Sequence, residues 1–187
     1  MTNSNTHIRV ASETDILHAD EVCRWYHISS QERGTGIATR TVSYIQKKMQ
    51  TGDAVIAYNG IEPIGFCYIE TFEDKNYVSN SGLIVDKDYR GNGIAKEIKA
   101  KVFALARSKY PKAKVFGITT SDKVMKINID LGYIPTTFEN LTSDERFWNG
   151  CFSCPNYNIL IDKNKKMCLC TGMIADPKHL KNKTNEE

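Results

Sequence analysis

The sequence predicts one α/β domain of the α+β kind, in which helices flank a central sheet. Short apolar runs typical of strands alternate with segments whose apolar residues recur at helical spacing. The chain has 187 residues, of which 41% are hydrophobic, and this suits a single core. A glycine-rich turn at 90–95 joins an apolar run to a helical segment. We therefore expect a domain over 1–176 with a cysteine-rich segment at about 147–172, followed by a mobile polar tail at 177–187.

The first half of the chain predicts two helices that follow a short strand at 8–10. The first helix begins at the N-cap residue Ser12, which acidic residues follow, and runs to about Ser30. The segment 31–36 contains two glycines and breaks this helix, and a second helix follows at 39–50. Three strands are expected next, at 54–58, 63–72 and 77–86, with a hairpin turn at Asn59-Gly60.

The second half predicts further alternation of helices and strands. A helix at 95–109 stops before Pro111, and a strand follows at 114–119. A short helix capped by Ser121 or Asp122 ends at Leu131-Gly132, because glycine is a common helix stop. The chain then resumes an extended course at 133–134, and the apolar run at 157–161 predicts a final strand.

Charge and composition exclude several classes of protein. The net charge of +3 is too mild to predict nucleic-acid binding, although it is compatible with an anionic cofactor. No apolar stretch approaches the roughly 20 residues that span a bilayer, and the N-terminus does not read as a secretory signal. We expect a cytoplasmic protein without a membrane partner. Its six cysteines then predict reduced thiols or a metal site instead of disulfides.

The turn at 90–95 is the most informative motif of the chain. It follows the apolar run at 81–86 and opens the helix at 95–109. Two glycines let backbone N–H groups approach an anion, and the positive end of the helix dipole points at the same place. The pattern is neither a Walker loop nor the three-glycine dinucleotide fingerprint. It predicts a pyrophosphate site, with an ordinary strand-to-helix turn as the alternative.

Three features together resemble the GNAT superfamily of acyl-CoA-dependent N-acyltransferases. The turn Arg90-Gly91-Asn92-Gly93-Ile94-Ala95 is similar to the Arg/Gln-x-x-Gly-x-Gly/Ala turn of that family. The ending Leu131-Gly132-Tyr133 resembles the Leu-Gly-Phe that closes its fourth helix. The order β-α-α-β-β-β-α-β-α-β-β over 8–162 is also similar. The resemblance implies a mixed, mostly antiparallel sheet with two splayed strands and flanking helices.

The resemblance also implies an acyl-CoA, such as acetyl-CoA, as co-substrate. In that family the backbone of one splayed strand pairs with pantetheine, and the amides of the turn face the pyrophosphate. Carried over to this sequence, the expected cofactor-binding residues are Leu83, Ile84, Val85, Arg90, Gly91, Asn92, Gly93, Ile94, Ala95, Lys96 and Asn128.

The expected catalytic residues are Glu70, Asn80 and Asn128. Asn128 occupies the position where the family often has a tyrosine general acid, and an amide does not supply a proton. Tyr133, another tyrosine or water are the alternatives, and thiolate leaves tolerably without an acid. Glu70, at the end of a strand, is a candidate base acting through water, with a solvated surface acid as the alternative. Asn80 lies early in the cofactor strand and is expected to orient the amine.

Arg33 and Arg40 flank a pair of glycines in the region that covers the acceptor in the family. Guanidinium groups bind carboxylates in a bidentate manner, so both arginines, together with Glu70, are expected to contact an amino acid acceptor. Surface arginines on a mobile loop are the alternative. The chain, including the stretch at 147–154, resembles a bacterial subgroup linked to arginine biosynthesis. This implies L-glutamate as acceptor and an acetyl or succinyl donor.

Cys151, Cys154, Cys168 and Cys170 form two close pairs that could hold a structural zinc, with free thiols as the alternative. Cys23 and Cys67 lie in apolar patterns and are expected in the core. Two other functions stay open at this point: a protein N-acetyltransferase, and a CoA-binding regulatory module without catalysis. A homodimer is a further possibility that the sequence does not decide.

Overall fold

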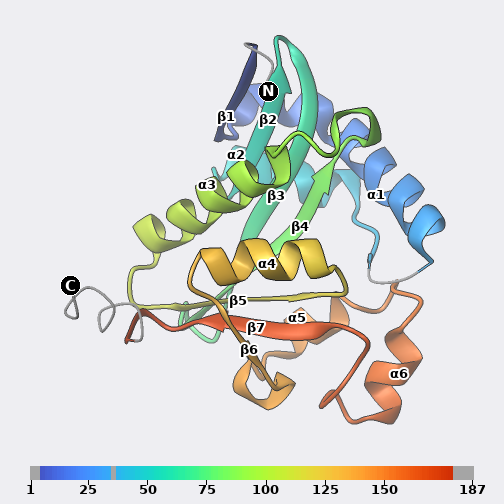
Figure 1. Ribbon diagram of the computed structural model, residues 1–187, viewed down its shortest axis with the longest axis vertical. Coiled ribbons are helices and arrows are strands. Elements are labelled where there is room, and N and C mark those ends of the chain that lie inside the picture. Colours follow the sequence, from blue (N-terminus) through green and yellow to red (C-terminus); the bar gives the residue numbers. More distant parts are fainter. Residues whose placement is uncertain (1–4, 35–36, 179–187) are drawn as a thin grey trace.

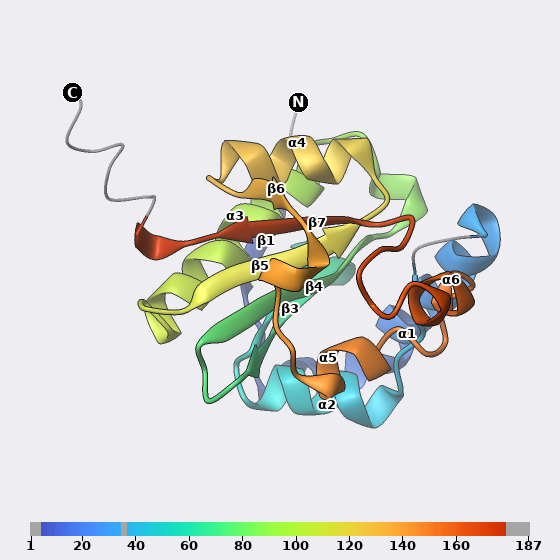
Figure 2. The same cartoon turned by 90° about the horizontal axis from the view of Figure 1, so that it is seen from below.

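The computed structural model describes residues 5–34 and 37–178 as a seven-stranded sheet with helices on both faces (Figures 1 and 2). The predicted tail lies outside the described residues from 179 onward. The strands are β1 Thr6–Val10, β2 Ala54–Asn59, β3 Glu62–Phe72, β4 Tyr77–Val85, β5 Lys114–Thr119, β6 Ile134–Thr136 and β7 Thr171–Ala175. The α-helices are α1 Ala19–Arg33, α2 Val42–Gln50, α3 Ile94–Lys109, α4 Asp122–Asp130, α5 Glu145–Asn149 and α6 Tyr157–Asp162. No helix of this described part is long and apolar enough to cross a membrane.

The sheet has the order β1-β2-β3-β4-β5-β7-β6, and every neighbouring pair is antiparallel except β4 and β5. The parallel pair is short, because only Tyr77–Ser79 of β4 pairs with β5. Beyond Ser79 the two strands separate, and β4 continues to Val85 with only β3 as its neighbour. The prediction of a mostly antiparallel sheet with two splayed strands is confirmed.

A β-bulge shapes β4 where it leaves β5. Gly82 and Leu83 of β4 lie opposite the single residue Cys67 of β3. Gly82 has φ of +66°, and its carbonyl accepts a hydrogen bond of 2.5 Å from the hydroxyl of Tyr26 in α1. Glycine suits this position because other residues avoid positive φ.

Two apolar layers hold the helices to the sheet. On one face, α3 buries Ile98, Val102 and Ala106 against β2, β3 and β4. On the other face, Trp25 of α1 and Ile45 of α2 pack on the sheet. Figure 2 shows α3 and α4 on one side of the strands and α1 and α2 on the other. The split between β4 and β5 therefore lies between two covered faces.

The sequence predicts most elements within a few residues, but the prediction of a final strand at 157–161 is wrong. Residues Tyr157–Asp162 form α6, with Leu160 turned into the core, and the last strand is β7. A five-residue apolar run fits a strand or a buried helical turn equally well. The strand β7 escapes prediction because Gly172 has poor strand propensity. Glycine is needed there, since a Cβ would lie 2.8 Å from the carbonyl oxygen of Thr136 in β6.

The first helix also differs from its expected course. Residues Glu13–His18 form a 3-10 helix, and α1 continues to Arg33, beyond the expected end near Ser30. Gly34 ends α1 with φ of +62°, as glycine commonly does.

Asp15 anchors this 3-10 helix to β1 and β2 with a buried carboxylate. It accepts hydrogen bonds from Arg9 at 2.7 Å, from the Tyr58 hydroxyl at 2.5 Å and from the backbone N–H of Ser12 at 2.7 Å. Burial alone would raise the pKa of Asp15, but these hydrogen bonds outweigh burial and hold the pKa well below its usual range.

We expect Asp15→Asn to lower the free energy of unfolding at pH 7 by about 2 kcal/mol. The lowered pKa means that the stabilisation is complete above the unfolded-state pKa of about 4 and is lost as pH falls below it. Urea unfolding at pH 7 and pH 3 measures this, with exposed Asp20→Asn as control. A difference between Asp15→Asn and wild type that is as large at pH 3 as at pH 7 would contradict the role of the charge.

Candidate active site

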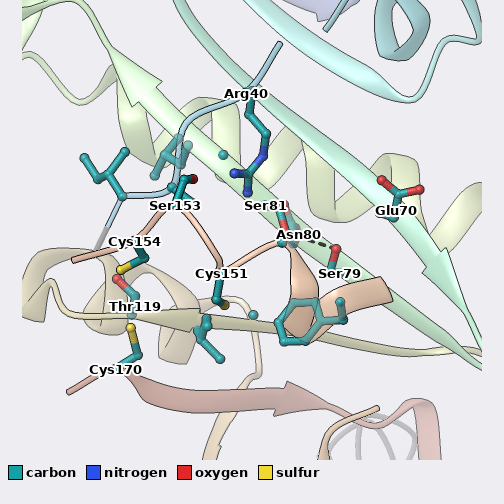
Figure 3. Close-up of a pocket in the computed structure, with 18 of the residues that line it drawn as sticks. Arg40, Glu70, Ser79, Asn80, Ser81, Thr119, Cys151, Ser153, Cys154 and Cys170 are labelled. Carbon is teal, nitrogen blue, oxygen red and sulfur yellow. Dashed lines mark hydrogen bonds between the residues drawn. The ribbon is translucent and has the colours of Figure 1, made fainter. Parts of the chain in front are cut away.

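A cavity of about 620 Å³ opens at the split between β4 and β5. Residues of β3, β4 and β5, of α1, α2 and the loop between them, and of α3 and α4 line it. Its volume falls within the range of small-molecule sites. Figure 3 shows Arg40 reaching into the cavity from the loop toward Ser81 of β4, with Thr119 and three cysteines farther away.

The remaining wall is the connection between β6 and β7, residues 137–170, which we call the roof segment. The backbone N–H of Thr39 donates to Ser153 Oγ of this segment at 2.9 Å. Glu73 Oε1 accepts three hydrogen bonds from Thr142 and Ser143, of 2.7 to 3.0 Å. The roof segment is thus tied to both sides of the cavity. The sequence analysis did not predict that the roof segment lines a cavity, although the unusual length of this connection is a signal of function.

Arg40 is the most distinctive group of the cavity. Its Nε donates to the Tyr68 hydroxyl at 2.6 Å, and its Nη1 donates to the Thr39 carbonyl at 2.9 Å. It forms no ion pair with any described residue, whereas Arg146, which also lines the cavity, is held by Asp144 at 2.6 Å. The Arg40 guanidinium is therefore a positioned cation that is available to an anion.

Arg33 also lines the cavity, but it lies in different surroundings from Arg40. Partial burial and the positive charge of Arg90 lower the pKa of Arg33. Arg90, which precedes the glycine turn, pairs with Glu32, the neighbour of Arg33 in the sequence, at 3.5 Å. The structure therefore places one predicted carboxylate receptor beside Tyr68 and the other toward the predicted pyrophosphate site.

Glu70, at the far end of β3, borders the cavity and is already engaged by two groups. Its Oε2 accepts a hydrogen bond from the Tyr44 hydroxyl and pairs with Lys48 Nζ at 2.9 Å. Its Oε1 has no hydrogen-bond partner among residues 5–34 and 37–178. Burial, with the neighbouring Tyr68 and Glu70, raises the pKa of Tyr44, so Tyr44 stays neutral and donates. One carboxylate oxygen is thereby free to face a ligand or water.

Asn80 is committed to contacts within the protein. Its Nδ2 donates to the Tyr133 hydroxyl at 3.1 Å, and its Oδ1 accepts from the Cys67 thiol at 3.4 Å. Ser81 Oγ beside it donates to Ser79 Oγ at 3.0 Å. Asn80 therefore holds the walls of the split in place.

Asn128 of α4 borders the cavity and is only 3% exposed. Its Nδ2 donates to Met173 Sδ at 3.4 Å, while its Oδ1 has no partner within the described part of the chain. An unsatisfied buried acceptor costs about 1–3 kcal/mol, so this oxygen is expected to meet a donor from a ligand or water.

Tyr133, the alternative acid, does not line the cavity. It is 1% exposed and its hydroxyl oxygen is occupied by Asn80. Burial raises its pKa above the usual range. The general acid of this site is therefore not identified by the sequence reasoning.

The glycine turn is shaped to receive an anion. Gly91 and Gly93 have φ of +89° and +82°, and a Cβ built on either meets no atom within 4 Å. No described residue accepts a hydrogen bond from the backbone N–H groups of residues 91–95. Arg90 Nε donates to the Val85 carbonyl at 3.0 Å and so fixes the turn to the end of β4.

The turn follows the open edge of β4 along the chain. The open edge of β4 beyond Ser79 leads from the cavity to the turn, and it includes Leu83, Ile84 and Val85. The side chains of Ile84 and Val85 are buried, so their backbone alone remains for a ligand. The open space and free N–H groups at the start of a long helix fit a pyrophosphate.

Gly93→Ala should weaken the affinity for coenzyme A by about 10-fold or more, because a Cβ would occupy the space of the anion and disfavour the positive φ. Titration calorimetry with coenzyme A measures the effect. Gly52→Ala is the control, since Gly52 has φ of +62° but lies away from the cavity after α2. If Gly93→Ala and the wild type bind coenzyme A with equal affinity, the turn is not part of the cofactor site.

The predicted zinc site is not formed. Cys151, Cys154, Cys168 and Cys170 all line the cavity as free thiols. No group of three or more His, Cys, Asp or Glu residues in the described ranges is placed to hold a metal. Burial raises the pKa of Cys151 to about 11 and of Cys170 to about 12, which keeps these thiols protonated.

The remaining two cysteines differ from each other in burial. Cys67 lies in the core as predicted, whereas Cys23 of α1, for which the sequence also predicts a core position, is only partly buried.

Residues 49–124 match a family model described as the acetyltransferase (GNAT) family. The comparison with curated proteins gives no match. Among solved structures, N-acetylglutamate synthase from Neisseria gonorrhoeae, complexed with coenzyme A and N-acetyl-glutamate, is similar with a TM-score of 0.65 and 15% identity. That likeness covers 94% of this chain and 36% of the synthase, so the chain spans about a third of that protein.

Two shorter proteins are similar over nearly their whole length. Diaminobutyrate acetyltransferase from Paenibacillus lautus, in complex with L-2,4-diaminobutyric acid and coenzyme A, has a TM-score of 0.61 and 10% identity, covering 94% of this chain and 96% of that one. Phosphinothricin acetyltransferase from Sinorhizobium meliloti, in complex with AcCoA, has a TM-score of 0.59 and 14% identity, covering 91% and 86%. The architecture of this chain is therefore the GNAT fold.

Proposed function

We propose that this chain is an acyl-CoA-dependent N-acyltransferase that acylates the α-amine of a small amino acid, since it has the GNAT fold and residues 49–124 match the acetyltransferase (GNAT) family model. L-Glutamate is the first candidate acceptor, and acetyl-CoA or succinyl-CoA is the donor. The observation that carries the proposal is the Arg40 guanidinium, which lines the cavity without a carboxylate partner in the described structure. A guanidinium group binds the carboxylate of an amino acid in a bidentate manner.

The donor side is supported by the turn and the open edge of β4. Residues 91–95 offer backbone N–H groups to the pyrophosphate, and the edge of β4 offers backbone groups to pantetheine. When bound there, acyl-CoA supplies an activated thioester. The bulge at Gly82 and Leu83 interrupts the regular pairing of β4 with β3, and both residues line the cavity. A thioester carbonyl bound there requires hydrogen-bond donors, which a backbone N–H group can supply.

The acceptor side is supported by Arg40 and Glu70. With its carboxylate on Arg40, an amino acid has its α-amine in the same cavity as the free Oε1 of Glu70. Glu70 is then placed to take a proton from the amine through water. Asn80 acts as a positioning residue, because both of its polar atoms are used inside the protein. The synthase that shares this fold was solved with N-acetyl-glutamate, which favours glutamate among amino acids.

The test is thiol release from acetyl-CoA and succinyl-CoA with a panel of amines. The panel contains glutamate, glutamate dimethyl ester, 2,4-diaminobutyrate and a lysine-containing peptide. We expect release with glutamate and none with its dimethyl ester, which lacks both carboxylates. Release with the peptide alone would favour the protein N-acetyltransferase. No release with any amine, despite tight binding of coenzyme A, would favour the regulatory module.

A further inference from the structure

Lys99 is a buried lysine to which the proposed function assigns no role. It lies on α3 and is only 2% exposed. Its neighbours on the buried face of the helix are the apolar residues Ile98 and Val102, which pack on the sheet. A lysine is almost never fully buried unless it is paired, because removing an ammonium group from water is costly.

The surroundings of Lys99 contain no carboxylate partner. It forms no ion pair or hydrogen bond with any residue in the described ranges, and its ammonium lies 5.5 Å from the centre of the Tyr133 ring. The titratable groups that face it are the Cys67 thiol of β3 and Tyr133, which follows α4. From β4 and α4 come the neutral amides of Asn80 and Asn128, which border the same cavity.

Lys99 lines the cavity together with Asn80, Leu83 and Asn128. These residues surround the split between β4 and β5, where the open edge of β4 receives pantetheine in the proposed function. The only anionic centre that the reaction creates on the pantetheine chain is the sulfur of the departing thiolate. A desolvated cation without a partner is complementary to such a charge.

We propose that Lys99 is the catalytic proton donor to the sulfur of coenzyme A. This inference rests on the proposed function. In the step, the acceptor nitrogen forms a bond to the acyl carbon, the carbon–sulfur bond breaks, and its electron pair goes to sulfur. A proton moves from Lys99 Nζ to that sulfur, and the neutral lysine regains a proton from water. The proton lost by the amine leaves through Glu70 and water, so that the products are an amide and the free thiol.

The other groups on this side of the cavity do not supply that proton. Asn80 and Asn128 are neutral amides, and Tyr133 is shielded from the cavity. Tyr26 lines the cavity, but its hydroxyl proton is committed to the Gly82 carbonyl. Burial lowers the pKa of Lys99 below its usual range, so its ammonium gives up a proton more readily than that of an exposed lysine.

The first test compares Lys99→Met with the exposed-site control Lys101→Met on the same helix. We expect kcat with acetyl-CoA to fall about 10- to 100-fold in Lys99→Met, with KM for acetyl-CoA changed less than about twofold. The decline of kcat at high pH in the wild type, where Lys99 loses its proton, should be absent from the variant. Lys101→Met should behave as wild type.

The second test measures the contact between Lys99 and the sulfur of coenzyme A in the absence of an amine acceptor. Free coenzyme A is bound to each protein, and the ultraviolet absorbance of its thiolate is followed as pH rises. The Lys99 cation should make the bound thiol titrate about one pH unit lower in the wild type than in Lys99→Met. Because no amine is needed, this result does not depend on the identity of the acceptor. Thermal unfolding verifies that the variant is folded, and Lys99→Gln repeats the measurement if Lys99→Met is not.

Two outcomes would overturn the inference. Identical titration of the bound thiol in wild type and variant would remove Lys99 from the sulfur. Loss of activity with succinyl-CoA alone, with acetyl-CoA unaffected, would assign Lys99 to the carboxylate of the acyl chain instead. Failure of the wild type to release thiol with any amine would count against the proposed function. The titration would still show whether Lys99 contacts the sulfur of coenzyme A.

Discussion

Replacing Arg40 by methionine should raise KM for the amino acid acceptor by about 100-fold, the largest effect on substrate binding that we expect. Charge-assisted hydrogen bonds contribute about 1.5–3 kcal/mol each, and loss of a bidentate pair therefore costs at least a factor of this size. KM for acetyl-CoA should change by less than about twofold, because the turn and the β4 edge are untouched. Steady-state kinetics with each substrate varied in turn measures both values.

The control for Arg40→Met is Arg24→Met, since Arg24 is exposed on α1 and does not line the cavity. Arg40→Lys adds a second comparison, because it keeps the charge but loses the planar fork. We expect its KM for the acceptor to lie between those of the wild type and Arg40→Met. Equal increases of KM for acceptor and acetyl-CoA would rule out a carboxylate receptor at this position.

Gly82→Ala should have the largest effect on stability and should also abolish activity. A Cβ at Gly82 would lie 2.4 Å from Tyr68 Cε1 and 2.6 Å from the Tyr26 hydroxyl oxygen. Both neighbours are buried aromatic residues, so the strand or the rings must shift. Together with the positive φ, this is expected to lower the free energy of unfolding by about 3 kcal/mol. The same shift would displace the bulge from the thioester.

Urea unfolding and thiol release are measured on the same samples, with Gly34→Ala as the matched control. Gly34 has φ of +62°, close to that of Gly82, but a Cβ there meets no atom within 4 Å. Its substitution therefore reports the backbone cost alone, about 1 kcal/mol. If the two alanine variants unfold with the same free energy, the contacts with Tyr26 and Tyr68 do not constrain the bulge.

The sequence predicts the parts of this protein that local chemistry determines. Gly91 and Gly93 are recognisable because a tight turn before a helix needs positive φ, and both have it. The hairpin at Asn59-Gly60 and the helix cap Ser121 are found for similar local reasons. Arg40 lines the cavity, while its expected role as a carboxylate receptor stays a prediction.

The sequence does not predict what depends on distant neighbours. Taken by itself, the apolar run at 157–161 fits a strand or a helix equally well. Within the roof segment it is helical. The four cysteines have near-ligand spacing, yet their elements leave them around the cavity instead of around one point. Lys99 reads as a surface residue within a lysine-rich helix, and only the packing of α3 on the sheet reveals its burial.

The roof segment and the loop that carries Arg40 have a consequence for how such a protein diversifies. Both lie outside the part of the chain that matches the family model, 49–124, whereas β4 and the glycine turn lie inside it. Under the proposed function, the residues of the donor side lie inside the matched stretch, whereas the acceptor side combines Glu70 from inside it with Arg40 from outside it. That proposal predicts that exchange of residues 137–170 and of the α1–α2 loop changes the preferred amine, while the turn at 90–95 and the open edge of β4 are retained. Acceptor preference would then vary among related chains independently of their affinity for coenzyme A.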